Sequence, residues 1–350
     1  MRHRAVIPPR GDVTYPAWSV MIPTYNCALY LRHTLAGVLA QDPGPDAMQI
    51  EVIDDHSTRD DPAAVVEELG RGRVTFYRQP ANVGSIRNFD TCLLRSRGRL
   101  VHLLHGDDCV RDGFYRTMQR PFDEHAEIGA AFCRQIMIDE DGHWQEITKL
   151  EQCHSGILPN WVEKIARGQR LTPPGIVVRR TVYEHLGGFD QRISCYGEDW
   201  EMWVRIAAHY PIWHEVEPLA LYRVKRRGSL SRAALHTAAD IRDMRLATDI
   251  VESYLPERLP APRAHELVNQ ARNGYARWAM TNARELFIAR DVGGGIAQLR
   301  AGLACSRSPD ILWGVGRLIA WAGMRWARWV TLRRVSSARG KDVGHLDVRL

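Results

Sequence analysis

The sequence predicts an α/β fold, with a mostly parallel sheet flanked by helices and a helical extension at the C-terminal end. Three observations support this prediction. Short apolar runs alternate with longer amphipathic runs between residues 18 and 133, which is the pattern of successive βαβ units. Polar residues follow several of the apolar runs directly, where parallel sheets bind their ligands. From residue 233 onward the pattern becomes helical.

The predicted strands are short apolar runs, and the predicted helices place apolar residues three to four positions apart. Strands are expected at residues 18–23, 50–54, 73–78, 100–104, 129–133 and 175–178. Helices are expected at residues 29–41, 61–69, 86–96 and 112–125, and another begins at Glu198. We therefore divide the chain into an N-terminal extension (1–17), an α/β domain (18–232) and a helical region (233–350).

The composition is that of a globular protein from a reducing compartment. A chain of 350 residues with 45% hydrophobic content can bury a large core. Its seven cysteines, without a Cys-x-x-Cys pair, argue against a disulfide framework or a zinc site. The N-terminus lacks a signal-peptide pattern, and the near-apolar region 311–324 is shorter than the roughly 20 residues of a spanning helix. We expect a cytoplasmic protein that is not integral to a membrane.

Two carboxylates, Asp54 and Asp55, follow the second predicted strand. A carboxylate there can accept a hydrogen bond from a nucleobase or a ribose hydroxyl, and Tyr25 after the first strand can add a ring contact. The alternative is that both aspartates are ordinary turn residues. The glycine motifs of dehydrogenases and P-loop enzymes are absent from the sequence, which disfavours both classes.

A second acidic pair, Asp107 and Asp108, follows the fourth predicted strand. Carboxylates are hard oxygen ligands that suit Mg²⁺ or Mn²⁺, and these ions share their coordination with substrate phosphates. Such a metal would neutralise the charge of a departing diphosphate. A plain turn is again the alternative.

A third acidic pair, Glu198 and Asp199, begins a helix with apolar residues at 200, 203, 204 and 207. A carboxylate in this position either caps the helix or acts as a general base toward a nucleophile. We favour Asp199 over Glu198 as the base. The helix N-terminus is expected to stabilise the ionised form of Asp199 and so to lower its basicity.

Six motifs occur in order along the chain, and together they resemble a known enzyme family. They are Ile22-Pro23-Thr24-Tyr25-Asn26, Val52-Ile53-Asp54-Asp55-His56-Ser57-Thr58, Asn82-Val83-Gly84, Leu103-Leu104-His105-Gly106-Asp107-Asp108, Gly187-Gly188-Phe189-Asp190 and Gly197-Glu198-Asp199-Trp200. The set is similar, in order and spacing, to the inverting family-2 glycosyltransferases of the GT-A (Rossmann-like) fold. The resemblance covers residues 18–232.

This resemblance implies a nucleotide-sugar donor, with a UDP-sugar favoured, and displacement at the anomeric carbon. The donor nucleotide and its diphosphate would be bound by Pro23, Tyr25, Asn26, Asp54, Asn82, Gly84 and Asp107, with Mg²⁺ or Mn²⁺ held by Asp107 and Asp108. Asp199 would deprotonate the acceptor hydroxyl, helped by Glu198. The acceptor side would include Gly188, Phe189, Asp190 and Trp200.

The sequence departs from the family pattern at two places. His105 stands where the family's usual Asp-x-Asp has its first aspartate, and it either ligates the metal or is a hydrogen-bonded structural residue. Lys225-Arg226-Arg227 lies where many relatives carry a histidine. These cations either screen the leaving diphosphate or form a solvated loop.

The helix expected over residues 311–334 combines an apolar stripe with arginines and tryptophans. Tryptophan and arginine on one helix are typical of an anchor at a membrane surface. The alternative is a helix that packs against the α/β domain or against a second subunit. The first reading gives peripheral membrane contact, and the second allows a homo-oligomer.

The leading hypothesis is an enzyme that transfers a sugar to a hydroxyl of a glycan or lipid-linked acceptor. It would work in the cytoplasm or on the inner face of the plasma membrane, in bacterial surface-polysaccharide assembly. The alternative is a glycosyltransferase-like binding protein without turnover, suggested by His105, although the presence of Asp199 favours the enzyme. The net charge of +6 does not indicate a nucleic-acid partner, because carboxylates occupy the places where phosphates would need cations.

Overall fold

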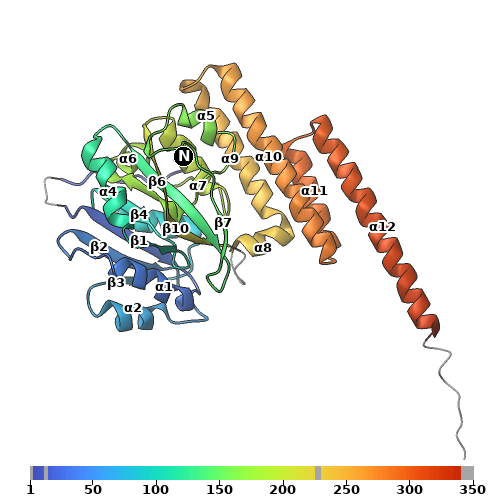
Figure 1. Ribbon diagram of the computed structural model, residues 1–350, viewed down its shortest axis with the longest axis horizontal. Helices are drawn as coiled ribbons and strands as arrows, with labels where there is room; N and C mark the ends of the chain where they lie inside the picture. The colour runs from blue at the N-terminus through green and yellow to red at the C-terminus, as the bar shows by residue number, and fades with distance from the viewer. Residues whose placement is uncertain (1–2, 12–14, 225–229, 340–350) are drawn as a thin grey trace, which may run out of the picture.

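The computed structural model describes residues 3–11, 15–224 and 230–339, with the backbone alone for 230–231 and 326–339. Its strands are β1 (Trp18–Thr24), β2 (Met48–Asp54), β3 (Thr75–Arg78), β4 (Leu100–Leu103), β5 (Cys109–Val110), β6 (Ala130–Ile138), β7 (Trp144–Ile147), β8 (Gly156–Ile157), β9 (Ile176–Arg179) and β10 (Ile212–Arg223). Within the described residues they form one sheet in the order β3-β2-β1-β4-β9-β6-β10-β5, with β7 beside β6 and β8 beside β10. Figure 1 shows helices packed around this sheet and C-terminal helices that extend to one side.

The first part of the sheet has the predicted parallel arrangement, and the second part is mixed. β1 pairs in parallel with β2 and β4, and β2 pairs in parallel with β3. β9 runs antiparallel to both of its neighbours, β4 and β6, whereas β6 and β10 are parallel. The predicted α/β class is confirmed, with antiparallel strands added beyond β4.

The sequence analysis does not predict β10, although β10 spans 12 residues. Charged residues and a proline, Glu215, Glu217 and Pro218, interrupt its apolar pattern. The sheet accommodates them because the register between β10 and β6 shifts on both sides of Pro218, as happens at a β-bulge.

Helices cover both faces of the sheet. They are α1 (Ala28–Leu39), α2 (Pro62–Gly70), α3 (Ser85–Arg95), α4 (Phe114–Glu124), α5 (Trp161–Ile165), α6 (Arg180–Leu186) and α7 (Glu198–Ala207), with a 3₁₀ turn, η1 (Pro173–Gly175), before β9. Successive strand residues point to opposite faces. Accordingly Val20 and Ile22 of β1 belong to the hydrophobic cluster of α1, α2 and α4, and Met21 belongs to the cluster of α3, α5, α6 and α7.

The N-terminal segment, residues 3–11, packs along the body of the protein. Ile7 is buried in the same hydrophobic cluster as Met21. The main-chain oxygen of Ala5 accepts a hydrogen bond from the N–H of Gly188 over 2.8 Å. Arg4 forms an isolated β-bridge with Asp190, and its side chain forms a salt bridge with Glu201 of α7. Ile7 therefore anchors the segment to the core, and Arg4 and Ala5 hold the chain that leads into α7.

The C-terminal helices continue this core. They are α8 (Leu230–Thr237), α9 (Ala239–Tyr254), α10 (Ala261–Ile288), α11 (Val292–Cys305) and α12 (Pro309–Arg339), with η2 (Leu255–Glu257) after α9. α9 packs on α7, and α10 packs on α9 and α11. α10 and α11 approach closely at Gly302, where an added Cβ would lie 2.9 Å from Cβ of Ala279. One hydrophobic cluster runs from α3 through α7 into α9, α10 and α11.

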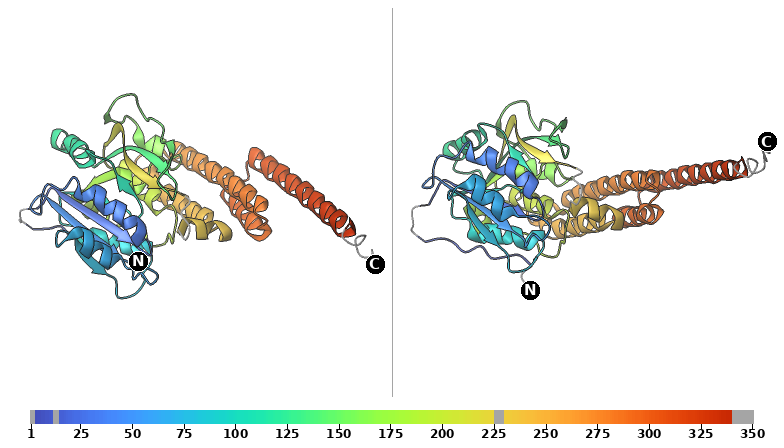
Figure 2. Two further views of the ribbon diagram at one scale, coloured as in Figure 1. Left: turned by 60° about the horizontal axis from the view of Figure 1, so that its bottom comes forward. Right: turned by 90° about the horizontal axis from the view of Figure 1, so that it is seen from below.

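Among the side chains that the structure describes, those in the first part of α12 pack against the other helices. Ile311 and Val315 are buried, whereas Leu312 and Ile319 are exposed. Figure 2 shows the remainder of α12 extending away from the other helices. The predicted apolar stripe is thus divided between a packed side and an open side, and the side chains of Trp326 and Trp329 lie outside the described residues. No helix in the described part of the chain is both long enough and apolar enough to span a bilayer.

Candidate active site

The exits of β1 and β2 are tied together by Asn26. Its backbone has φ of 48°, a left-handed conformation that asparagine tolerates better than most residues. Its side-chain oxygen accepts hydrogen bonds from the N–H groups of Thr58 and Arg59, over 3.0 and 2.9 Å. Its own N–H donates to Oγ of Ser57. Pro23 is buried in β1, and Tyr25 beside Asn26 is exposed, so its ring is accessible to a ligand.

Asp54 and Asp55 are both buried and hydrogen-bonded. Asp54 accepts from the N–H of Ser57 and from Nε of Arg78, the latter over 2.7 Å. Asp55 accepts from the N–H groups of Val83 and Gly84, over 2.7 and 3.0 Å. Burial raises the pKa of Asp55, against the effect of these two hydrogen bonds. The carboxylates therefore join the β2 exit to the loop before α3.

Asn82 strengthens the same junction, because its side-chain amide donates to the main-chain oxygen of Asp55 over 3.1 Å. Gly84 has φ of 87° and immediately precedes α3. The structure thus brings Asn26, Asp54, Asn82 and Gly84 to neighbouring loops at one edge of the sheet. Each of these residues has a hydrogen-bond partner within the protein, but Nδ2 of Asn26 is buried without one among the described residues.

The turn after β4 lies beside the β1 exit, since the N–H of Gly106 donates to the main-chain oxygen of Pro23 over 2.9 Å. In this turn, one potential ligand atom each from His105, Asp107 and Asp108 lies within 4.8 Å of the other two. The His105 ring stacks on Phe89 with 5.0 Å between centroids. Burial lowers the pKa of His105, which favours the neutral imidazole that ligates metals. Two carboxylates and a neutral imidazole fit a divalent cation.

Arg223 of β10 fixes this turn, and the sequence analysis did not single it out. Its N–H donates to Oδ1 of Asp108 over 2.8 Å, and its Nε donates to the main-chain oxygen of Asp107 over 2.9 Å. Its Nη1 also donates to the main-chain oxygens of Asp139 and Glu140. The signal that could have revealed Arg223 is the basic run at 225–227, which begins two residues after it. That run itself lies outside the described residues.

The acidic pair begins α7. Gly197 precedes it with φ of 88°. Oδ1 of Asp199 accepts from the N–H of Trp200, and Oδ2 accepts from Nε2 of Gln169, each over 2.7 Å. Glu198 is buried, and its Oε2 has no hydrogen-bond partner among the described residues.

Burial raises the pKa values of both carboxyls, and the charge of Asp199 raises that of Glu198 further. The hydrogen bonds from Gln169 and Trp200 oppose this effect on Asp199 but do not cancel it. The N–H groups at the helix start lower the pKa of Asp199, as expected, but desolvation raises it by more.

Tyr222 of β10 connects the two acidic regions. Burial raises its pKa well above the usual range, and nearby Tyr196 and the charges of Asp108, Asp199 and Asp107 raise it further. Charges from the turn after β4 and from the start of α7 therefore both contribute to the raised pKa of Tyr222. The sequence analysis did not single out Tyr222.

The four residues predicted for the acceptor side are buried. The N–H of Phe189 donates to Asp90, and an added Cβ on Gly188 would lie 2.2 Å from Oδ1 of the same aspartate. Asp190 forms a salt bridge with Arg192 over 2.8 Å. Nε1 of Trp200 donates to the main-chain oxygen of Ile165 over 2.8 Å. These four residues support the part of the chain that carries Glu198 and Asp199.

Residues 19–187 match the family model described as Glycosyl transferase family 2. The chain is 30% identical over 205 residues to the uncharacterized protein MT1568 of Mycobacterium tuberculosis, covering 55% of this chain and 62% of that protein. It is 25% identical over 234 residues to the O-antigen biosynthesis protein RfbC of Myxococcus xanthus, covering 59% of this chain and 17% of that protein. The chain thus spans less than two-thirds of the length of these relatives.

Two solved structures share the fold at low sequence identity. S. aureus TarS in complex with UDP has a TM-score of 0.61 and 14% identity, covering 95% of this chain and 94% of that chain. The mannosyltransferase PcManGT from Pyrobaculum calidifontis, in complex with GDP-Man and Mn²⁺, has a TM-score of 0.53 and 16% identity, covering 91% of this chain and 84% of that chain. The motifs, the GT-A fold and the family match agree, and residues 19–187, about half of the chain, match glycosyl transferase family 2.

Proposed function

We propose that this protein transfers a sugar from a nucleotide-diphosphate sugar to a hydroxyl group of a glycan or lipid-linked acceptor, with inversion at the anomeric carbon. The observation that carries this proposal is that a domain matching family 2 holds both a possible metal-binding turn after β4 and a buried acidic pair at the start of α7. A metal-binding turn and a carboxylate of raised basicity are the two groups that such a transfer needs. Both groups occur here within a domain that matches family 2.

We propose that the donor nucleotide lies along the exits of β1, β2 and β3. Tyr25 offers an exposed ring to the base, and the loops fixed by Asn26 and Asp55 form the floor. The contacts would come from Pro23, Tyr25, Asn26, Asp54, Asn82, Gly84 and Asp107. UDP is the favoured nucleotide, in line with the UDP bound in the TarS structure.

Asp107 and Asp108 would hold Mg²⁺ or Mn²⁺, and His105 is a third ligand of suitable position. When bound, the cation neutralises negative charge on the diphosphate leaving group. Arg223 keeps the turn in place through its hydrogen bonds to Asp107 and Asp108. The Mn²⁺ in the PcManGT structure supports a divalent metal in this fold.

Asp199 would accept the proton of the acceptor hydroxyl as that oxygen attacks the anomeric carbon. The bond to the diphosphate breaks on the opposite side, so the configuration inverts. A base with a pKa raised toward neutrality is better matched to this proton transfer than an ordinary aspartate. Glu198, whose pKa is raised further, would be protonated over part of the neutral range and donate a hydrogen bond on the acceptor side. The part of the chain that carries Glu198 and Asp199 would be supported by Gly188, Phe189, Asp190 and Trp200.

We further propose that residues 18–232 form the catalytic domain, with 1–17 and 233–350 as flanking regions. The open side of α12 would allow peripheral contact with the inner face of the plasma membrane or with a second subunit in a homo-oligomer. The RfbC relative, named for O-antigen biosynthesis, supports a role in polysaccharide assembly. We propose the cytoplasm as the location from the sequence alone.

The deciding experiment is calorimetric titration of UDP, GDP and dTDP into the purified protein, with and without Mn²⁺. We expect metal-dependent binding of one nucleotide. We also expect release of that nucleotide from its sugar conjugate. Nucleotide binding without any turnover would favour the alternative of a binding protein. No binding under either condition would overturn the proposal.

A further inference from the structure

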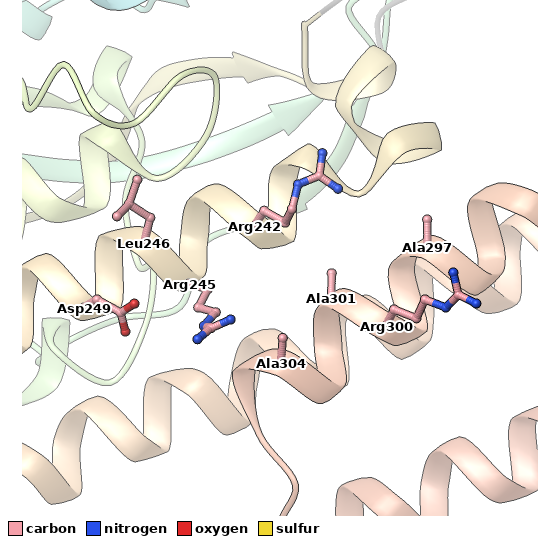
Figure 3. A pocket seen from close by; sticks show the side chains of 8 residues that line it. All are labelled: Arg242, Arg245, Leu246, Asp249, Ala297, Arg300, Ala301 and Ala304. Atoms are coloured by element: carbon pink, nitrogen blue, oxygen red, sulfur yellow. The ribbon is translucent and has the colours of Figure 1, made fainter.

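Away from the candidate active site, α9 and α11 border an open groove of ≈ 600 Å³. Three exposed guanidinium groups line it, from Arg242 and Arg245 of α9 and Arg300 of α11. Figure 3 shows Arg245 reaching from α9 into the gap between the two helices. None of the residues that line the groove belongs to the candidate active site.

The positive charge of this groove is not balanced within the described residues. Asp249 is the carboxylate that lines the groove, and it already accepts a hydrogen bond from Arg272 over 2.5 Å. Arg242 donates to the main-chain oxygen of Thr237 over 2.8 Å. The guanidinium groups of Arg245 and Arg300 have no hydrogen bond or ion pair with any described residue. Two or three arginine side chains are therefore available to a ligand.

The shape of the groove suits a compact anion. Ala297 and Ala301 of α11 line it opposite α9, and their short side chains leave room between the helices. Guanidinium groups present planar pairs of N–H donors that match phosphate oxygens and bind them in a bidentate manner. Phosphate groups in the groove would pair with guanidinium donors of Arg245 and Arg300 that have no partner among the described residues.

α9 also connects this groove to the acidic pair. On its other side, Asp243 accepts hydrogen bonds from the N–H groups of Ser194 and Cys195, over 3.0 and 2.8 Å. Met244 packs against Gly197, where an added Cβ would lie 2.5 Å from its Sδ. The groove and the chain leading to Glu198 are thus separated by the thickness of one helix, about 10 Å.

We propose that the groove between α9 and α11 is a binding site for phosphate groups, with Arg245 and Arg300 as its main contacts. The phosphate belongs either to a soluble phosphorylated chain or to a lipid headgroup. Where the phosphate is part of the acceptor, the inference rests on the proposed transferase function, and the acceptor then passes beside α9 on its way to Asp199.

The test uses the full chain and two double variants. R245A/R300A removes the two unpaired guanidinium groups, and R116A/R120A removes two exposed arginines from α4, on the sheet domain. Inorganic pyrophosphate is titrated calorimetrically into each protein in EDTA, with D107N as a further control for binding at the donor site. In a second arm, each protein is sedimented with phosphatidylcholine vesicles that contain phosphatidylglycerol.

We expect R245A/R300A to bind pyrophosphate about tenfold more weakly than the wild type, and R116A/R120A to bind it as the wild type does. Any difference between D107N and the wild type measures the share of pyrophosphate bound at the donor site. A loss in the pyrophosphate arm identifies free phosphate groups as ligands, and a loss in the vesicle arm alone identifies lipid headgroups. Unchanged binding by R245A/R300A in both arms would overturn the proposal. Because no donor or divalent metal is present, this result does not depend on whether the chain is a transferase.

Discussion

Gln169 donates a hydrogen bond from Nε2 to Oδ2 of Asp199 over 2.7 Å, and the same nitrogen donates to the main-chain oxygen of Leu171 over 2.8 Å. Both amide hydrogens of Gln169 are therefore used, so the amide has a fixed orientation. The second carboxylate oxygen, Oδ1, accepts from the N–H of Trp200. Asp199 is consequently held in one orientation from two sides, as a general base must be.

Removal of the Gln169 amide should alter the pH dependence of transfer. Its hydrogen bond stabilises ionised Asp199 and lowers its pKa, so Q169L should raise this pKa by about 0.5–1 unit, given the partial exposure of the pair. The acidic limb of the profile of kcat/KM against pH, where the base becomes ionised, should move to higher pH by the same amount. Q270L, at an exposed glutamine of α10 bonded to Glu266, should leave the limb unchanged. An unmoved limb in Q169L would mean that Asp199 is not the group that titrates.

Replacement of the base itself should separate chemistry from binding. D199N keeps the size of the side chain but cannot accept the proton, so turnover should fall by about 10²- to 10⁴-fold. Nucleotide affinity measured by calorimetry should remain within a factor of two or three of wild type, roughly the scatter expected for a group that does not contact the donor. D123N, at an exposed aspartate of α4, is the matched control. Near-native turnover by D199N would show the base to be elsewhere.

The three potential ligands after β4 should contribute unequally to metal binding. D107N and D108N each remove a carboxylate charge, and H105A removes a neutral donor. Mn²⁺ affinity, followed by the loss of the free-ion EPR signal, should therefore fall more in D107N and D108N than in H105A. A fall in H105A beyond the wild-type error would identify His105 as a ligand. Equal affinities in H105A and wild type would limit the role of His105 to stacking on Phe89.

His102 should make the fold sensitive to acid. It is fully buried, and burial lowers its pKa to about 3, whereas in the unfolded chain it is about 6.5. The unfolded state alone binds this proton between those values, so stability is full above pH 6.5 and is lost as pH falls toward 3. By pH 5 the loss from this residue should be about 2 kcal/mol. Urea unfolding of H102Q, which does not titrate, should fall off less steeply between pH 7.5 and 5, and parallel curves for the two proteins would contradict this account.

Gly197 should tolerate no side chain. Its φ of 88° disfavours other residues, and an added Cβ would lie 2.5 Å from Sδ of Met244, so G197A should cost about 1–3 kcal/mol of unfolding free energy. The change should also lower turnover, because Glu198 and Asp199 follow directly. G316A, at an exposed helical position of α12 with no atom within 4 Å of the added Cβ, should instead raise stability by up to about 1 kcal/mol. Thermal unfolding of both variants checks the opposite signs.

The sequence predicts the parts of this fold whose local pattern and tertiary environment agree. β1 and β2 are buried at every residue, and their predominantly apolar residues reveal them, although Glu51 interrupts the run in β2. The acidic turns after β2 and β4 are predicted for the same reason, because they follow such runs directly. The order of the six motifs then identifies the family more reliably than any one motif does.

Other features depend on contacts that no local pattern records. The charges within β10 conceal a central strand, which is stabilised by its pairing with β6. Arg223 looks like one more cation in a basic stretch, and only the fold brings it to Asp107 and Asp108. The raised pKa of Asp199 also follows from burial under distant elements, whereas the sequence reveals only the helix terminus.

The attachment of residues 3–11 has a consequence for the order in which this protein matures on the ribosome. Arg4 and its partner Glu201 are separated by 197 positions, and Ile7 enters a core whose other members include residues of α9 and α10. During vectorial synthesis the early strands can pair while this segment still lacks its binding partners. The segment can therefore make its contact with α7 only after residue 201 has been synthesised, and the surroundings of the acidic pair are incomplete until then.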